Sequence, residues 1–244
     1  MTATVHCHLQ GSVAVLTLSN PPLNVVTREL TLALQTQLVV LDRNPDVRAL
    51  GITGEGEKAF CAGSDIAEFS QWLSPGQIVP QKLALQHEVF SYLDHYPKPV
   101  VAALNGLTFG GGMEIALCCD LLVAEQQVKL ALPEIKLGVF PSSGGPLRVV
   151  RRVGEARARE LMLLGDPVDA DTALAWGLVN RVVTRGCAVA KALELAGQLA
   201  ARPPLAYRLC KAVIAASLDQ PEPEALAFSL QASDQVFSSA ECAE

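Results

Sequence analysis

The sequence contains no run of Lys or Arg, no Cys-x-x-Cys pair and no apolar segment long enough to cross a membrane. Its 25 acidic residues outnumber its 19 basic residues, and the net charge of -6 disfavours a nucleic-acid-binding face. Gly, Asp, Glu or Arg interrupts each apolar run before the roughly 18 residues that a membrane span needs. We therefore expect neither nucleic acid nor a membrane as a partner.

The cysteines and the first residues bear on the compartment. Seven cysteines are an odd number, and most of them lie in apolar sequence, which indicates reduced and buried thiols. The start, Met1 to His6, has neither a basic segment nor an apolar one, so we expect no signal peptide and a cytoplasmic protein. His6 and His8 flank Cys7 and would share one face of a strand, but no further cluster completes a tetrahedral set, so no metal is expected.

What is present is a hydrophobic α/β pattern. Half of the 244 residues are hydrophobic, which is enough for a sizeable core. Short apolar strands are predicted at residues 13–18, 49–54, 100–106, 121–124 and 129–132, with helices at 28–42 and 113–120. From residue 155 the pattern is nearly all helical, and no internal repeat is visible. We expect an α/β core over residues 1–185 and a helical C-terminal region over residues 186–244.

Two glycine turns, one at Gly63 and one at Gly110 to Gly112, and two glutamates suggest chemistry. Gly110, Gly111 and Gly112 open a predicted helix, where free backbone N–H groups at the positive end of the helix dipole suit a developing negative charge. A tight strand-to-helix turn explains the glycines equally well when they are taken alone. Glu114 is also favoured by the dipole without any catalytic role. Glu134, between two apolar neighbours, is harder to explain without function.

Seven segments, taken in order, resemble the enoyl-CoA hydratase/isomerase family, also called crotonases. They cover nearly the whole chain: Asn20-Pro21-Pro22-Leu23-Asn24, Ile52-Thr53-Gly54, Phe60-Cys61-Ala62-Gly63-Ser64-Asp65-Ile66, Lys98-Pro99-Val100-Val101-Ala102-Ala103-Leu104-Asn105-Gly106, Gly110-Gly111-Gly112-Met113-Glu114, Pro133-Glu134-Ile135-Lys136-Leu137-Gly138 and Gly144-Gly145-Pro146-Leu147-Arg148. The resemblance implies a spiral of repeated strand-strand-helix units and a helical C-terminal trimerisation region. It also implies a homotrimer or homohexamer that takes an acyl-CoA thioester.

The resemblance also assigns site residues. The backbone N–H groups of Ser64 and Gly111 would hold the thioester carbonyl, and Ala62, Asp65 and Ile66 would join these two residues in binding the acyl-CoA. Fixed donors there stabilise the enolate-like state more than the ground state. Family members frequently have alanine at this position; the Ser64 hydroxyl would either add a contact or face solvent, and we expect it to face solvent. Coenzyme A belongs to the substrate, so no separate cofactor is expected.

The two glutamates would divide the proton transfers. Family members that keep both acids resemble hydratases, in which Glu114 activates a water for attack at the β-carbon and Glu134 exchanges a proton at the α-carbon. The interpretation is therefore hydration of a 2-enoyl-CoA to a 3-hydroxyacyl-CoA. Enoyl-CoA isomerisation, or a non-catalytic acyl-CoA-binding relative, are the alternatives.

Three further features follow from the resemblance or from the pattern. Residues 68–86 would shape the acyl pocket, with Trp72 as a candidate lining residue. The sequence ends at residues 238–244, where family members usually continue with a tail that helps to cover the site. Apolar residues on more than one face of the C-terminal helices indicate a subunit interface: Leu161, Leu164, Leu174, Leu178, Leu195 and Leu199.

Overall fold

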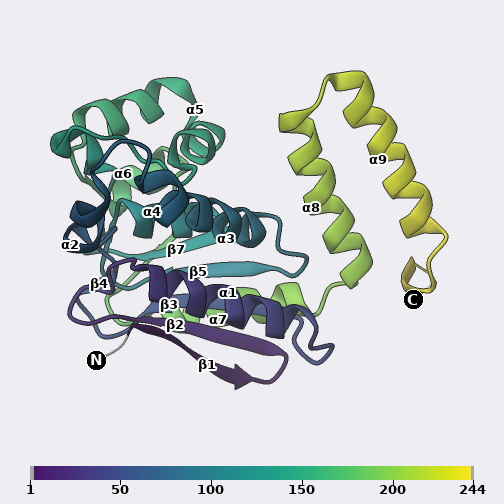
Figure 1. Ribbon diagram of the computed structural model, residues 1–244. Helices are drawn as coiled ribbons and strands as arrows, with labels where there is room; N and C mark the ends of the chain where they lie inside the picture. The colour runs from purple at the N-terminus through teal and green to yellow at the C-terminus, as the bar shows by residue number, and fades with distance from the viewer. Residues whose placement is uncertain (1–2, 243–244) are drawn as a thin grey trace.

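The computed structural model describes residues 3–242, and its largest sheet has six strands (Figure 1). In spatial order these are β1 (Thr4–Gln10), β2 (Val13–Ser19), β3 (Ala49–Gly54), β5 (Val100–Leu104), β7 (Leu121–Glu125) and β10 (Arg181–Val183). β1 pairs with β2 in antiparallel fashion, and every later pairing in this sheet is parallel. The central parallel strands β3, β5 and β7 are nearly all buried, as expected for strands covered on both faces of a sheet.

A second sheet has four short strands. They are β4 (Ala59–Cys61), β6 (Leu107–Phe109), β8 (Lys129–Ala131) and β9 (Val168–Asp169), in that spatial order. Each successive pair of strands from β3 onward places one member in each sheet, which is the repeating step of a spiral. Gly106 permits this crossing, because a Cβ atom there would lie 2.5 Å from the Lys58 carbonyl group.

Nine α-helices are present among residues 3–242. They are α1 (Arg28–Asp42), α2 (Ile66–Phe69), α3 (Ala84–Asp94), α4 (Gly111–Leu117), α5 (Gly145–Leu164), α6 (Ala170–Ala175), α7 (Ala188–Ala200), α8 (Pro204–Asp219) and α9 (Glu222–Phe237). The predicted helix at 28–42 is confirmed: Thr27 caps it through Leu30 N–H, and Leu30, Leu34, Leu38 and Leu41 are buried. The predicted α/β class is confirmed as well.

Three predicted elements differ from the structure. The helix expected at 113–120 begins two residues earlier and ends at Leu117. The helix expected to begin at residue 155 is α5, which begins at Gly145 and has a kink at Gly154, where φ is 74°. β9 and β10 lie in the region expected to be nearly all helical, since strands of two or three residues carry no readable periodicity.

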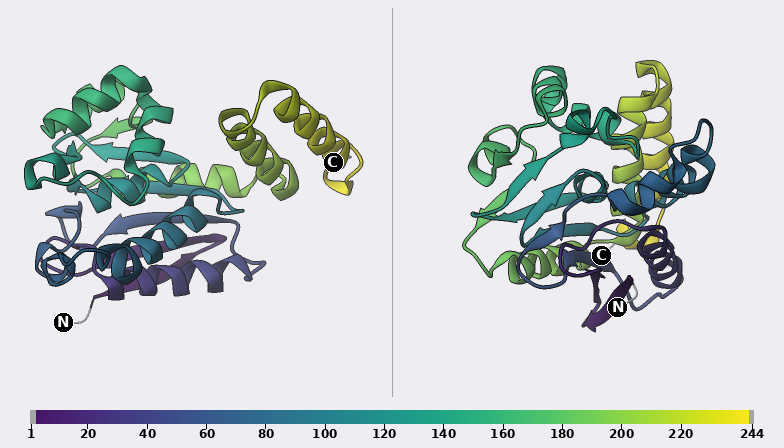
Figure 2. Two further views of the ribbon diagram at one scale, coloured as in Figure 1. Left: turned by 45° about the horizontal axis from the view of Figure 1, so that its top comes forward. Right: turned by 60° about the vertical axis from the view of Figure 1, so that its left-hand side comes forward.

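The C-terminal helices divide into two groups. α7 packs against β3, β5 and β7, burying Ala188, Ala192, Ala196 and Ala200. α8 and α9 pack on each other and stand to one side of the sheets (Figures 1 and 2). The described contacts thus join α7 to the core, while the division at residue 185 stays a prediction.

The cysteines are less buried than the sequence indicated. Cys61, Cys118 and Cys119 are buried, but four others, Cys7, Cys187, Cys210 and Cys242, are exposed. Expecting most thiols to be buried was wrong, because local apolar sequence does not say which side of a helix or edge strand faces the core. Cys7, for example, lies on β1, whose residues after Val5 are exposed.

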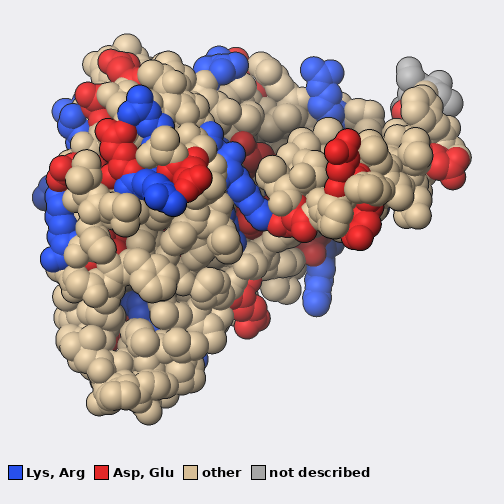
Figure 3. Space-filling model, turned by 90° about the horizontal axis from the view of Figure 1, so that it is seen from above, with Lys and Arg blue, Asp and Glu red and all other residues tan. Residues whose placement is uncertain are grey.

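The surface findings concern membranes, metals and charge. No helix in residues 3–242 is long and apolar enough to cross a membrane. No group of three or more His, Cys, Asp or Glu side chains within the same residues could hold a metal ion. On the face shown in Figure 3, Lys and Arg are interspersed with Asp and Glu and form no basic patch.

Candidate active site

The predicted glutamates meet at one cavity of about 260 Å³. Glu114 comes from α4, and Glu134 from the 3₁₀ turn Pro133–Leu137 that follows β8. The loop between β4 and α2 brings Ala62, Gly63 and Ser64 to the same cavity. Its apolar lining includes Ile66, Phe69, Ile78, Leu83, Leu137, Val139 and Phe140.

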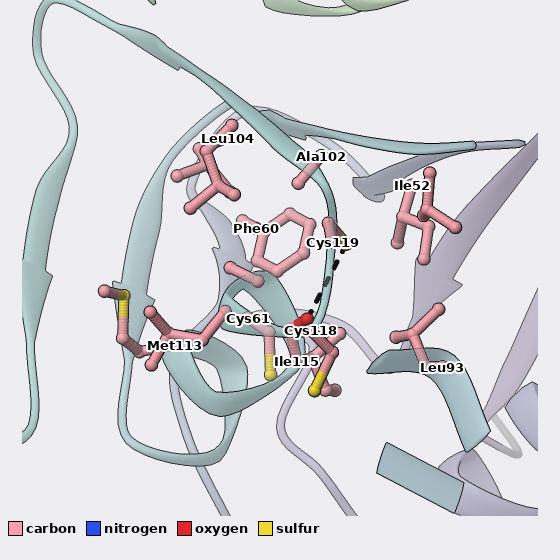
Figure 4. Packing of buried hydrophobic residues seen from close by; sticks show 14 of the residues in the cluster. Ile52, Phe60, Cys61, Leu93, Ala102, Leu104, Met113, Ile115, Cys118 and Cys119 are labelled. Atoms are coloured by element: carbon pink, nitrogen blue, oxygen red, sulfur yellow. Dashed lines mark hydrogen bonds between the residues drawn. The ribbon is translucent and has the colours of Figure 1, made fainter. Parts of the chain in front are cut away.

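α4 is held rigidly by the core. All seven of its residues are buried. Figure 4 shows Met113 and Ile115 of this helix near Phe60 of β4 and Leu104 of β5, all members of one hydrophobic cluster. A Cβ atom on Gly112 would lie 2.1 Å from the Cys61 carbonyl oxygen, so this glycine is required for close packing. The start of α4 therefore has one fixed position beside β4.

The backbone N–H groups of Ser64 and Gly111 are available at this position. Val26 pairs with the Ser64 loop, because Val26 N–H donates to Gly63 O at 2.7 Å and Asp65 N–H donates to Val26 O at 3.0 Å. This pairing leaves Ser64 N–H without an acceptor among the described residues. Gly111 N–H belongs to the first turn of α4 and likewise has none there. A Cβ atom on Gly111 would lie 3.6 Å from Ser64 N, so the two segments are adjacent.

Ala62, Asp65 and Ile66 were also predicted to bind the acyl-CoA, but not all three line the cavity. The cavity lining includes Ala62 and Ile66 but not Asp65, whose carboxylate caps α2 by accepting from Ala67 N–H at 2.8 Å. Ser64 is partly exposed and lines the cavity, and its Oγ would lie 3.2 Å from a Cβ atom on Gly111, so the expectation that the hydroxyl faces solvent stays a prediction. Trp72 is not among the lining residues of the cavity.

Glu114 is buried and fixed by backbone donors. Its Oε1 accepts from Ser143 N–H at 2.7 Å and from Gly145 N–H at 2.8 Å. Burial raises the pKa of Glu114, while these two N–H groups and the nearby Arg148 charge act in the opposite direction. Since Oε1 accepts two hydrogen bonds, a proton on this carboxyl group belongs on Oε2.

Glu134 has a very different environment. Its Oε2 is buried and has no hydrogen-bond partner among the described residues. Burial raises the pKa of Glu134 to about 7, and the charge on Glu114 adds to this effect, while its own backbone N–H opposes it. A carboxyl group with such a pKa can both give and take a proton near neutral pH. The site thus combines two free N–H donors with two carboxyl groups of different environments.

Similarity to known proteins identifies the family of the chain. The family model described as "Enoyl-CoA hydratase/isomerase" matches residues 8–244. The chain belongs to this family. A carnitinyl-CoA dehydratase of Salmonella typhi is 36% identical over 225 residues, which are 92% of this chain and 85% of that protein.

Solved structures of the crotonase family have the same fold. An enoyl-CoA hydratase of Bacillus anthracis superposes with a TM-score of 0.91 at 31% identity, covering 98% of this chain and 92% of that one. Pseudomonas aeruginosa DspI gives a TM-score of 0.92 at 33% identity, covering 97% of this chain and 90% of that one. The protein is thus a crotonase-family acyl-CoA enzyme.

The crotonase site contains polar residues that sequence reasoning missed. Lys82, Gln86 and Ser143 line the cavity and are buried. Lys82 and Gln86 belong to the region expected to shape the acyl pocket, but nothing in that region distinguishes them from exposed helical residues. For Ser143, the neighbouring glycines were the one signal, and they did not match a nucleophile motif.

Proposed function

We propose that this chain is an enoyl-CoA hydratase, which adds water to a 2-enoyl-CoA and forms a 3-hydroxyacyl-CoA. The observation that carries the proposal is the meeting of Glu114 and Glu134 at a cavity lined by Ser64, whose free backbone N–H lies next to Gly111, the residue with the second free N–H. Isomerisation needs a single acid or base at the α- and γ-carbons. A second fixed carboxylate is the group that water addition requires.

In the proposed mechanism, Ser64 N–H and Gly111 N–H hold the thioester oxygen. Negative charge grows on this oxygen as the β-carbon is attacked, and the two donors stabilise it without moving. Both N–H groups are parts of backbone segments fixed by β4, Val26 and α4. Coenzyme A enters as part of the substrate and no separate cofactor takes part in the reaction.

The proton transfers use both glutamates. Glu114 takes one proton from the water as its oxygen bonds to the β-carbon, and the carbon-carbon double bond breaks. Glu134 gives its proton to the α-carbon. The product contains the added water molecule. The two glutamates hold one proton before and after the reaction, on Glu134 at the start and on Glu114 at the end. The pKa of about 7 for Glu134 suits this role, because the group holds a proton readily at neutral pH.

Absorbance of the conjugated enoyl thioester tests the proposal. Added enzyme should bleach crotonyl-CoA, with 3-hydroxybutyryl-CoA as the product by mass spectrometry. Growth of conjugated absorbance from a 3-enoyl-CoA, without bleaching of the 2-enoyl-CoA, would instead identify an isomerase. Binding of both thioesters without any change would identify a non-catalytic relative.

A further inference from the structure

A buried amide with an unused hydrogen-bond donor lines the candidate active site. Gln86 lies on α3 and is 2% exposed, yet it contributes to the cavity wall. Its Oε1 accepts from the Ser143 hydroxyl at 2.7 Å, while its Nε2 has no partner in the described part of the chain. A buried donor left unpaired is costly, so an amide in this position indicates an acceptor that arrives with the ligand.

Ser143 fixes where this donor points. Its backbone N–H donates to Glu114 Oε1, and its carbonyl oxygen accepts from Arg148 Nη1 at 3.0 Å. Arg148 Nε in turn donates to Asp94 Oδ2 at 3.0 Å on α3, the helix that carries Gln86. Every polar group of Ser143 is therefore engaged, and Gln86 is held through it beside Glu114.

The free donor belongs to the orientation in which Ser143 Oγ donates to Gln86 Oε1 and Nε2 is left without a partner among the described residues. In the opposite orientation Nε2 would donate to Ser143 Oγ, and the serine hydroxyl would donate to the adjacent Glu114 carboxylate rather than into the cavity. The unused donor is therefore Gln86 Nε2, in the orientation that the structure shows. It lies next to Glu114, the acid assigned to the water, and the network contains no link to Glu134.

We propose that Gln86 donates a hydrogen bond to the β-oxygen of the reaction, which is the attacking water in hydration and the departing hydroxyl group in dehydration. The inference rests on the proposed hydratase function. A water that donates hydrogen bonds to the two carboxyl groups and accepts one from Gln86 keeps one lone pair, and this lone pair is directed at the β-carbon. Gln86 transfers no proton, so the atom balance of the reaction is unchanged.

This role separates Gln86 from the α-carbon chemistry. Exchange of the α-protons of a saturated acyl-CoA needs the two N–H donors and Glu134, but it involves no β-oxygen. Loss of the Gln86 donor should therefore slow hydration without slowing exchange. A purely structural role would slow both reactions together, because both depend on the same folded cavity.

The variant for the test is Gln86→Met, which keeps the length of the side chain and removes the amide. We expect kcat for crotonyl-CoA hydration to fall roughly 10- to 100-fold, less than for loss of an oxyanion donor. Exchange of butyryl-CoA α-protons in deuterated water, followed by mass spectrometry, should stay within about twofold of the parent. Ser143→Ala removes the hydroxyl that holds the amide and frees the amide to rotate. It should lower kcat for hydration less than Gln86→Met does and should also leave exchange nearly unchanged.

Gln81→Leu is the matched control, because Gln81 is exposed, precedes Gln86 by five residues and does not line the cavity. It should leave both reactions unchanged. The inference is overturned if Gln86→Met hydrates crotonyl-CoA at the parent rate, or if it loses hydration and exchange equally. It is also overturned if the only change is a higher KM for acyl chains that bear an extra oxygen, because Gln86 would then bind the acyl chain and not the β-oxygen. A parent enzyme that exchanges α-protons but never hydrates would instead refute the proposed function.

Discussion

Glu134 and Gly110 are in close contact at the wall of the cavity: a Cβ atom on Gly110 would be 2.8 Å from Glu134 Oε1. Gly110 also has a φ of 49°, in the region that favours glycine. The turn before α4 therefore does two things. It frees the N–H groups of the first helical turn, and it leaves room for the carboxylate of Glu134 beside them.

Replacing Glu134 by Gln should remove most turnover. The amide keeps the shape of the side chain but cannot exchange a proton, so we expect kcat for hydration to fall roughly 10²- to 10⁴-fold with KM nearly unchanged. Steady-state kinetics with crotonyl-CoA measure both constants. Turnover within a few-fold of the parent would contradict the assignment of the α-proton to Glu134.

Replacing Glu114 by Gln should affect hydration more than α-proton exchange. The variant loses the carboxylate that takes a proton from water, whereas Glu134 and the two N–H donors remain. Hydration is followed by absorbance, and exchange by deuterium incorporation into butyryl-CoA. Equal losses in the two assays would show that the two roles are not separable.

The pH dependence should reflect a single proton shared by the two acids. Burial raises the pKa of Glu134 to about 7 and also raises that of Glu114. The reactive pair holds one proton, on Glu134 for hydration and on Glu114 for dehydration, so both directions require the same protonation state. We expect kcat/KM to fall in both directions as pH rises through about 7. Profiles that stay level up to about pH 9 would contradict this.

Gly111→Val should abolish most activity. Even a Cβ atom at this position would lie 3.2 Å from Ser64 Oγ and 3.4 Å from Val26 Cγ2, and valine adds two methyl groups where the thioester oxygen has to bind. A loss of roughly 10²- to 10³-fold in kcat is expected. Gly197→Ala is the control, because a Cβ atom there meets nothing within 4 Å. A Gly111 variant that folds by circular dichroism and keeps substantial turnover would refute the oxyanion assignment.

Lys82→Met should lower stability. Lys82 is 3% exposed, and its Nζ donates to Glu68 Oε2 at 2.5 Å and to Val26 O at 3.3 Å, which ties α2 to the strand pairing at Ser64. Removing the cation leaves Glu68 partly buried without its charge partner, which costs about 3–5 kcal/mol in the free energy of unfolding. Urea denaturation measures this. Lys136→Met, which breaks the exposed pair with Asp166, should cost less than about 1 kcal/mol.

The enzyme should form a trimer or a dimer of trimers. α8 and α9 expose five large apolar side chains: Ile214, Leu218, Leu226, Leu230 and Phe237. Of the leucines that the sequence suggested, Leu161 and Leu178 are buried within the chain, whereas Leu164 and Leu174 are exposed. Light scattering at micromolar concentration should report three or six chain masses, and a monomer would contradict the prediction. Leu230→Lys should weaken the assembly, and Val40→Lys, an exposed position on α1, should not.

The sequence by itself determined the family and the main local elements. α1 was predicted at its observed bounds because its leucines recur at helical spacing along one continuous segment. The order of seven weak motifs identified the crotonase family, because their combined spacing is restrictive where each alone is not. Both glutamates and the glycine turns were found this way.

Only the tertiary structure decided what surrounds those residues. Gln86 and Ser143 are 57 residues apart, and Lys82 and Val26 are 56 apart, so no local pattern could reveal that they touch. The strands β9 and β10 became visible only through pairing with β8 and β7. Periodicity reports which face of a segment is apolar, whereas the spiral decides which distant segment meets that face. For that reason the polar contacts of the cavity and the exposure of the cysteines were set by packing.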